Sequence, residues 1–266
     1  MPFTLAHPAA ILPLARRVRT LVLSALVVGS VVPDFEYVLP LGVARTSSHS
    51  LAGLFLFCLP VGFAVYLLWH LWFKRPVAAL LPAAIGARLP ASTDRGLPDA
   101  SAALVSACLL AGATTHLLWD SFTHANGRMV QSLAWLQRPV FTIEHVPIAV
   151  YLLLQHASTL LGLGVIAFAA AHALRATPPG RPRALPLVLR TLVISALVLV
   201  PLACGWRAAP WAEFSSPSLR LFYRAAYLIV TAIIRGFGAT LLVYATLWNL
   251  ARLRRPARLA GTGAAG

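Results

Sequence analysis

Acidic residues are scarce in this sequence: only seven Asp and Glu side chains occur in 266 residues, and all charged residues together make up 11%. A soluble domain carries about 25% charged residues, so the composition excludes an ordinary soluble globular domain. Hydrophobic residues reach 59%, and the mean hydropathy is +0.79. This composition indicates an integral membrane protein.

Cysteine is also rare. The three cysteines, Cys58, Cys108 and Cys204, each lie in an apolar run and show no pairing or metal-binding spacing. This pattern argues against a disulfide framework. We expect all three to be small, buried hydrophobic residues.

Lysine is nearly absent, since Lys74 is the single lysine among 22 basic residues. The formal net charge of +15 could indicate a nucleic-acid partner. The basic residues, however, fall in short loops between apolar runs and do not share one amphipathic face. We therefore expect no nucleic-acid partner and attribute the charge to membrane topology.

Long apolar runs are what the sequence has in abundance. Five of them have about the ~20 residues that span a hydrocarbon core, and they lie near residues 50–72, 100–119, 146–172, 186–205 and 221–250. The predicted fold class is all-α, a polytopic integral membrane protein with about five spanning helices. Its principal partner is the lipid bilayer.

The loop charges predict the orientation of these helices. Fifteen Lys and Arg residues fall in loops on one side, six fall on the other, and Arg235 lies inside the last run. Because basic loops concentrate on the cytoplasmic side, we expect the side with fifteen to be cytoplasmic.

The N-terminal 33 residues differ from the five runs. His7-Pro8 opens a short apolar segment that ends at Arg16, and a second segment from Leu21 to Val32 leads to Pro33-Asp34. Neither is long enough to cross a bilayer. We predict a short helical hairpin that brings His7 and Asp34 close together.

The composition along the chain predicts four parts. A membrane domain with the polar residues covers 1–172, a Pro-rich cytoplasmic linker covers 173–185, two C-terminal spanning helices cover 186–250, and a basic disordered tail covers 251–266.

Ionisable residues in or near apolar helices are costly, and they are functional candidates for that reason. The stretch THLLWDSFTH places His116, Asp120 and His124 four residues apart. At 100° per residue, these three side chains project from one face of a helix. Two imidazoles and a carboxylate at this spacing suit Zn or another divalent transition metal.

Other segments bring further ligands to the same membrane side. Asp34 follows the hairpin there, His49 begins the next apolar run there, and His7 joins them if the hairpin forms. The predicted metal ligands are therefore His7, Asp34, His49, His116, Asp120 and His124. They form one site on the extracytoplasmic side.

Five segments carry a resemblance to a known group of proteins: MPFTLAHPAAILPL, SALVVGSVVPDFEY, RTSSHSLAGLFLF, THLLWDSFTHANG and LLQHASTLLGL. Together they resemble an uncharacterised bacterial multi-pass membrane family, a domain of unknown function. Their motif order is similar to that of predicted membrane-bound metal-dependent hydrolases and, more distantly, of zinc-dependent phospholipases C. The resemblance covers roughly residues 1 to 165.

The resemblance implies a metal-dependent hydrolase in a bacterial cytoplasmic (inner) membrane, with departures from the pattern, one of them at a ligand position. Those hydrolases have Pro-Asp-x-Asp-His where this chain has Pro33-Asp34-Phe35-Glu36-Tyr37. Tyr37 thus stands at a position where those hydrolases have a metal ligand. The pattern therefore does not decide between one metal ion and two.

Hydrolysis of a lipid or lipid-linked phosphoester is the reaction that this site predicts. Asp34 or Asp120 would act as ligand and base, and Glu36 and Glu144 are further catalytic candidates. His156 and Arg235 are candidates for supporting the ligands or binding substrate. The alternative is a non-enzymatic membrane protein, a metal or proton carrier or an assembly partner, that uses the same residues. The sequence does not predict the oligomeric state.

Overall fold

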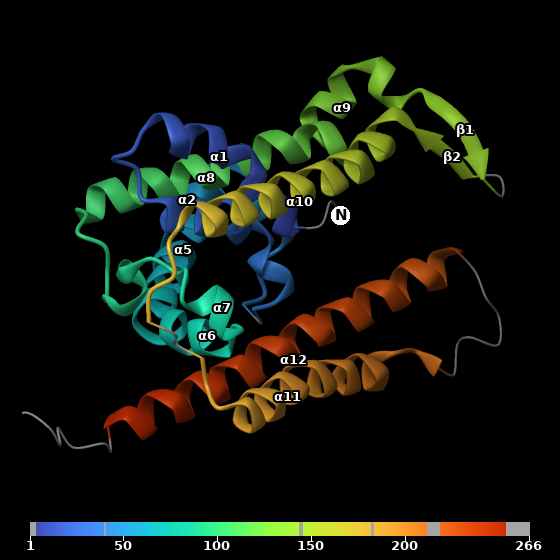
Figure 1. Cartoon of the computed structure of the whole chain (residues 1–266). Coiled ribbons are helices and arrows are strands. Elements are labelled where there is room, and N and C mark those ends of the chain that lie inside the picture. The colour runs from blue at the N-terminus through green and yellow to red at the C-terminus, as the bar shows by residue number, and fades with distance from the viewer. Residues whose placement is uncertain (1–3, 40, 144–145, 182–183, 212–218, 254–266) are drawn as a thin grey trace, which may run out of the picture. The chain divides into compact units, whose positions relative to one another are not determined.

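The computed structural model describes residues 4–39, 41–143, 146–181, 184–211 and 219–253 (Figure 1). Two compact units are present. One combines Met1–Leu67 with Leu97–Thr177, and the other combines Leu68–Gly96 with Pro178–Gly266. The segment Leu68–Gly96 lies within the predicted membrane domain of residues 1–172, and in the structure it belongs to the second unit.

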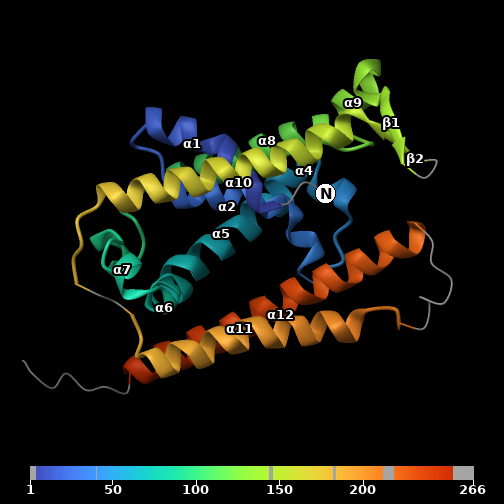
Figure 2. The same ribbon diagram turned by 45° about the vertical axis from the view of Figure 1, so that its right-hand side comes forward.

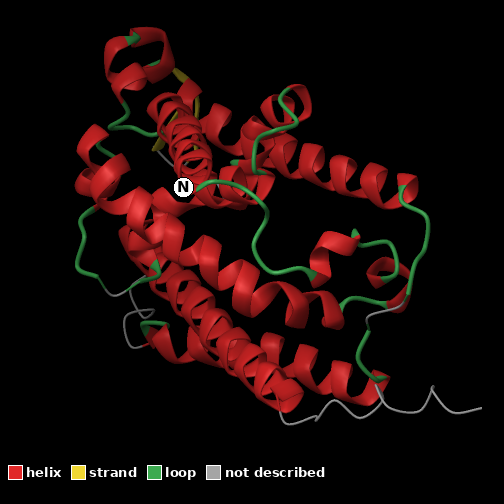
Figure 3. Ribbon diagram, turned by 90° about the vertical axis from the view of Figure 1, so that its left-hand side faces the viewer, coloured by secondary structure: helices red, strands yellow, loops and turns green. Residues whose placement is uncertain are grey.

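The described part of the chain is mostly helical, as Figure 3 shows, and within it five helices are long and apolar enough to cross a membrane. These five candidate spans are Leu51–Leu80, Ala102–Ser132, Val150–Ala176, Leu187–Ala208 and Leu221–Leu253. The prediction of an all-α protein with about five spanning helices is confirmed.

The N-terminal segment of the first unit forms short helices. They are η1 (Thr4–Ala6), α1 (Pro8–Arg17), α2 (Leu23–Val31) and η2 (Val32–Tyr37). Pro8 begins α1, where its missing N–H costs nothing. The expected short helices are therefore present, and α1 and α2 pack against each other.

The first unit contains eight further helical segments among the described residues. They are α3 (Arg45–Ser48), α4 (Leu51–Gly53), the π-turn η3 (Leu54–Cys58), α5 (Leu59–Leu68), α8 (Ala102–Thr123), α9 (Arg128–Ser132), η6 (Ala134–Gln137) and α10 (Val150–Ala176). Helices α1, α2, α8 and α10 lie side by side in both ribbon views (Figures 1 and 2). Their core contains Ile11, Leu26 and Leu109, which are almost completely buried.

A small β-hairpin precedes α10 and was not predicted. Strands β1 (Pro139–Ile143) and β2 (Val146–Ala149) pair antiparallel, with Phe141 opposite Ile148. The third span therefore begins at Val150 and not at residue 146. Residues 146–149 are apolar enough to resemble a helix start, but Pro147 and the β-branched residues beside it favour extended backbone.

The second unit contains η4 (Trp69–Phe73), α6 (Lys74–Leu80), α7 (Ala83–Gly86), η5 (Ala91–Asp94), α11 (Leu187–Ala208) and α12 (Leu219–Leu253). Helices α11 and α12 pack along each other (Figure 2). Hydrogen bonds from Trp72 Nε1 to Thr246 Oγ1 (3.2 Å) and from Asn249 Nδ2 to the Trp72 carbonyl (3.1 Å) connect η4 to α12. Most of the predicted tail, residues 254–266, lies outside the described residues.

Glycines allow α2 and α8 to approach closely. A Cβ atom on Gly29 would overlap the Leu109 carbonyl, and one on Gly112 would overlap the Leu26 carbonyl. Backbone-to-backbone contact of this kind is how small residues bring membrane helices together. It also brings the Ser30 end of α2 close to His116 on α8.

We expect Gly29→Ala to destabilise the protein, because the methyl group would meet rigid backbone, and overpacking costs about 1–3 kcal/mol. The thermal midpoint of the protein in detergent micelles should fall. Gly164→Ala is the matched control, since a Cβ there meets nothing within 4 Å, and its midpoint should be unchanged or higher. Equal midpoints for the two variants would contradict this account of the α2–α8 contact.

Candidate metal centre

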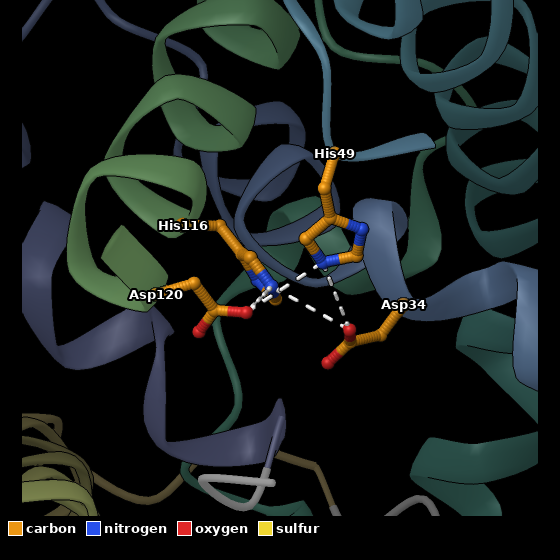
Figure 4. Close-up of side chains that lie close together, drawn as sticks. All are labelled: Asp34, His49, His116 and Asp120. Carbon is orange, nitrogen blue, oxygen red and sulfur yellow. Dashed lines mark ion pairs between the residues drawn. The ribbon is translucent and has the colours of Figure 1, made fainter. Parts of the chain in front are cut away.

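Three separate segments bring four ligand-type side chains to one point in the first unit (Figure 4). Asp34 comes from η2, directly after Pro33, and His49 follows the last residue of α3. His116 and Asp120 lie one helical turn apart on α8, so their side chains share a face.

One ligand atom from each of Asp34, His49, His116 and Asp120 lies within 4.8 Å of the other three. Asp34 Oδ1 is 3.3 Å from His49 Nε2 and 3.6 Å from His116 Nε2. Asp120 Oδ2 is 3.5 Å from His116 Nε2 and 3.6 Å from His49 Nε2. Figure 4 shows the two imidazoles and the two carboxylates pointing toward one another. We call this group the four-residue cluster.

The second nitrogen of each imidazole is held by a hydrogen bond that decides which nitrogen faces the cluster. His116 Nδ1 lies 2.8 Å from the Ser30 carbonyl, which can only accept, so Nδ1 must carry the proton. His49 Nδ1 lies 2.8 Å from Ser48 Oγ. The Ser48 hydroxyl donates its hydrogen bond to the Arg45 carbonyl, so His49 Nδ1 is the donor to Ser48 Oγ. In the neutral rings, both Nε2 lone pairs therefore point into the cluster, as metal-binding histidines require.

Within the described part of the chain, burial leaves one nitrogen of each imidazole without a hydrogen bond. The His116 side chain is completely buried, and those of Asp34 and Asp120 are 7% exposed. His49 Nε2 and His116 Nε2 are buried and have no hydrogen-bond partner among the described residues. Unpaired buried polar atoms cost free energy, and a divalent cation would pair with both. Two imidazoles and two carboxylates fit such an ion.

His7 lies against the four-residue cluster. Its ring stacks on the ring of His116 with the centroids 3.8 Å apart, and its Nε2 is 3.6 Å from Asp120 Oδ1. Burial lowers the pKa of His7 to about 4. A neutral His7 can thus offer a lone pair, although it is not one of the four mutually close residues.

His124 caps the C-terminus of α8 at the edge of the site. Its Nδ1 is 3.4 Å from Asp120 Oδ2, and its Nε2 is 3.4 Å from Arg45 Nη2. His124 therefore contacts a residue of the four-residue cluster without joining the cluster.

Arg45 is a residue of the site that sequence analysis missed. Its Nη1 donates to Asp34 Oδ1 at 3.2 Å and its Nη2 to Asp120 Oδ2 at 2.6 Å. Nη1 also donates to the Tyr37 hydroxyl at 2.6 Å. In the sequence, Arg45 was interpreted only as one of the basic loop residues that predict the membrane orientation. Its position one helical turn before His49 was the signal that could have identified it.

The carboxyl groups of η2 have opposite pKa shifts. Burial alone would raise the pKa of Asp34, but the His116 and His49 rings that face it outweigh burial when they are protonated, and they hold that pKa well below its usual range. Thr4 Oγ1 contributes by donating to Asp34 Oδ2 at 2.6 Å. Burial raises the pKa of Glu36, and neither of its oxygens has a hydrogen-bond partner among the described residues.

The remaining candidates lie elsewhere. The His156 side chain is exposed on α10, and Arg235 is exposed on α12 of the second unit. Glu144 lies outside the described residues. The roles assigned to these three residues stay predictions.

Comparison with known proteins assigns the chain to a family without assigning an activity. No curated protein and no solved structure matches it. A domain of unknown function, DUF4184, matches residues 1–246, which is nearly the whole chain and agrees with the expected uncharacterised family. The chain belongs to the DUF4184 family.

Proposed function

We propose that this protein is a membrane-embedded metal-dependent hydrolase that acts on a lipid or lipid-linked phosphoester. One observation carries the proposal. Two buried imidazole nitrogens without hydrogen-bond partners among the described residues and two carboxylate oxygens converge in an otherwise apolar helical unit. Charged and polar groups at such a position are retained for function.

Zinc is our first candidate for the metal, because it prefers imidazole and carboxylate ligands. When bound, a divalent cation supplies Lewis acidity and activates a nucleophile at neutral pH. The chain would hold it with Asp34, His49, His116 and Asp120, and His7, which lies against them, could serve as an additional ligand.

Proton transfer falls to a carboxylate oxygen that the other contacts leave available. Asp120 Oδ1 is buried, lies 3.6 Å from His7 Nε2 and has no hydrogen-bond partner among the described residues. Hydrolysis forms a bond from a water oxygen to phosphorus and breaks the bond to the ester oxygen, so one water proton must be accepted and a proton must be returned to the ester oxygen as it leaves. Asp120 Oδ1 is the favoured acceptor, and Asp34 and Glu36 are the other candidates.

An apolar groove beside His7 supports a lipid substrate. It runs between α1 and α10 and has a volume of about 340 Å³. Its lining includes Ala9, Ala10 and Pro13 of α1 and Leu161 and Val165 of α10. The groove continues past Pro13 to Arg16 and Arg17. A hydrocarbon chain lying there would direct its polar end toward His7 and the four-residue cluster.

The loop charges support an extracytoplasmic location for the site in a bacterial cytoplasmic membrane. On this orientation, the cluster lies toward the extracytoplasmic ends of its helices. There it would meet lipid head groups more readily than soluble cytoplasmic metabolites.

We expect the purified full-length protein to bind a divalent metal that His116→Ala and Asp34→Ala variants bind at least roughly 10- to 100-fold more weakly. Elemental analysis after dialysis against Zn²⁺ measures this. His172→Ala is the control, because His172 is exposed on α10, and it should keep the wild-type metal content. Equal metal content in all four proteins would overturn the metal site.

Hydrolysis should require both the metal and the proton acceptor. In detergent micelles, release of phosphate or of a phosphorylated head group from lipid substrates should stop on chelation and return with Zn²⁺. Asp120→Asn should lower the rate by roughly 100-fold or more. A metal-loaded protein that hydrolyses none of a panel of phospholipids and prenyl phosphates would favour the non-enzymatic alternative.

The groove predicts chain-length selectivity. Ala10→Trp would fill it, so we expect kcat/KM for a long-chain phosphoester to fall by roughly tenfold or more, with little change for a short-chain analogue. Ala167→Trp is the control, since Ala167 is exposed on α10 and lies outside the groove lining. Equal losses for both chain lengths would contradict a role of the groove in binding the chain.

A further inference from the structure

Arg45 places a fixed positive charge beside the four-residue cluster. It begins α3, and its guanidinium reaches between the Asp34 and Asp120 carboxylates. The side chain is 25% exposed. The two nitrogens contact one carboxylate each, so the planar group joins the two acidic residues much as a bridging cation would.

The oxygens that Arg45 contacts are also the ones that face the histidines. Asp34 Oδ1 accepts a hydrogen bond from Arg45 Nη1 and lies 3.3 Å from His49 Nε2. Asp120 Oδ2 accepts a hydrogen bond from Arg45 Nη2 and lies 3.5 Å from His116 Nε2. A carboxylate oxygen has two lone pairs. Each of these oxygens can therefore bind a metal ion on the imidazole side and the guanidinium on the other.

The guanidinium is surrounded by other groups of the kinds that bind metals. Glu36 Oε1 is 4.0 Å from Arg45 Nη1, and His124 Nε2 is 3.4 Å from Nη2. The Tyr37 hydroxyl also contacts the guanidinium, because it accepts a hydrogen bond from Arg45 Nη1. In two-metal hydrolases, the ions lie about 3.5–4 Å apart, and here a cation of the chain itself lies next to the cluster.

The charges also match one ion. Asp34, Asp120 and Glu36 oppose a single guanidinium, which leaves two negative formal charges. One divalent ion neutralises them. A second would be placed against the guanidinium in a site shielded from water, where repulsion between like charges is strong.

We infer that Arg45 takes the place of a second metal ion, so the chain binds one divalent ion and uses the guanidinium as the other positive charge facing the substrate phosphoryl group. This inference rests on the proposed function, and it decides between the one and two ions that the sequence left open. Arg45 then has two tasks. It orients both ligand carboxylates, and it stabilises negative charge on the phosphoryl oxygens.

The experiment measures metal stoichiometry and requires no enzymatic assay. Full-length protein in detergent micelles is stripped with a chelator, titrated with Zn²⁺ to saturation, desalted and analysed for metal per chain. We expect about one ion for the wild type and for Arg45→Lys, which keeps the charge. We expect about two for Arg45→Ala, because the vacated volume exposes Glu36 and His124 as ligands.

Two further variants complete the design. Arg45→Ala/Glu36→Gln should return to about one ion, because a ligand of the second position is removed. Arg128→Ala should stay at about one, because Arg128 is exposed on α9 and provides the same loss of charge away from the cluster.

Two ions in the wild type, or one in Arg45→Ala at saturation, would overturn the assignment of Arg45 and leave the metal site in place. No bound ion in the wild type would instead overturn the proposed function, on which the inference depends. If Arg45→Ala fails to fold, as judged by gel filtration, the wild-type stoichiometry tests the assignment by itself: one ion supports it, and two ions overturn it.

Discussion

Two carboxylates buried against each other in an apolar helical unit are the constraint on which the site depends. Asp34 and Asp120 both lose most of their hydration, and burying ionised groups is costly unless they are paired. The surrounding residues provide that pairing. Arg45 donates to both carboxylates, His49 and His116 face both, and Thr4 donates to Asp34. The side chains that meet here come from four separate helical segments.

The packing of the first unit brings these segments together. Gly29 and Gly112 let α2 and α8 touch through their backbones, and this places the Ser30 carbonyl where it can accept from His116. The orientation of the His116 imidazole, a candidate metal ligand, thus follows from a helix–helix contact between small residues. The same packing leaves an apolar groove between α1 and α10 that leads to His7. The four-residue cluster and the apolar groove thus meet at His7, and this meeting is the basis of the proposed lipid substrate.

Sequence patterns predicted much of this. The apolar runs predicted five spans because a bilayer core requires about 20 residues per helix. The spacing of His116 and Asp120 placed them on one face because an α-helix repeats every 3.6 residues. The β-hairpin at residues 139–149 was not predicted, because short apolar runs do not distinguish strand from helix. Arg45 was not recognised either: its position one helical turn before His49 is a weak local signal, and only the tertiary structure shows that it bridges two carboxylates.

The sequence alone therefore determined the features that follow from composition or helical periodicity. These are the class of protein, the number of spans and the ligand face of α8. Each of these follows from interactions within a single helix or between a helix and the bilayer. The tertiary structure decided which polar groups meet. It decided that His7 stacks on His116, that His124 stays at the edge, and that Arg45 lies between Asp34 and Asp120. These contacts join residues up to 109 positions apart, so they depend on how the helices pack, which no local pattern encodes.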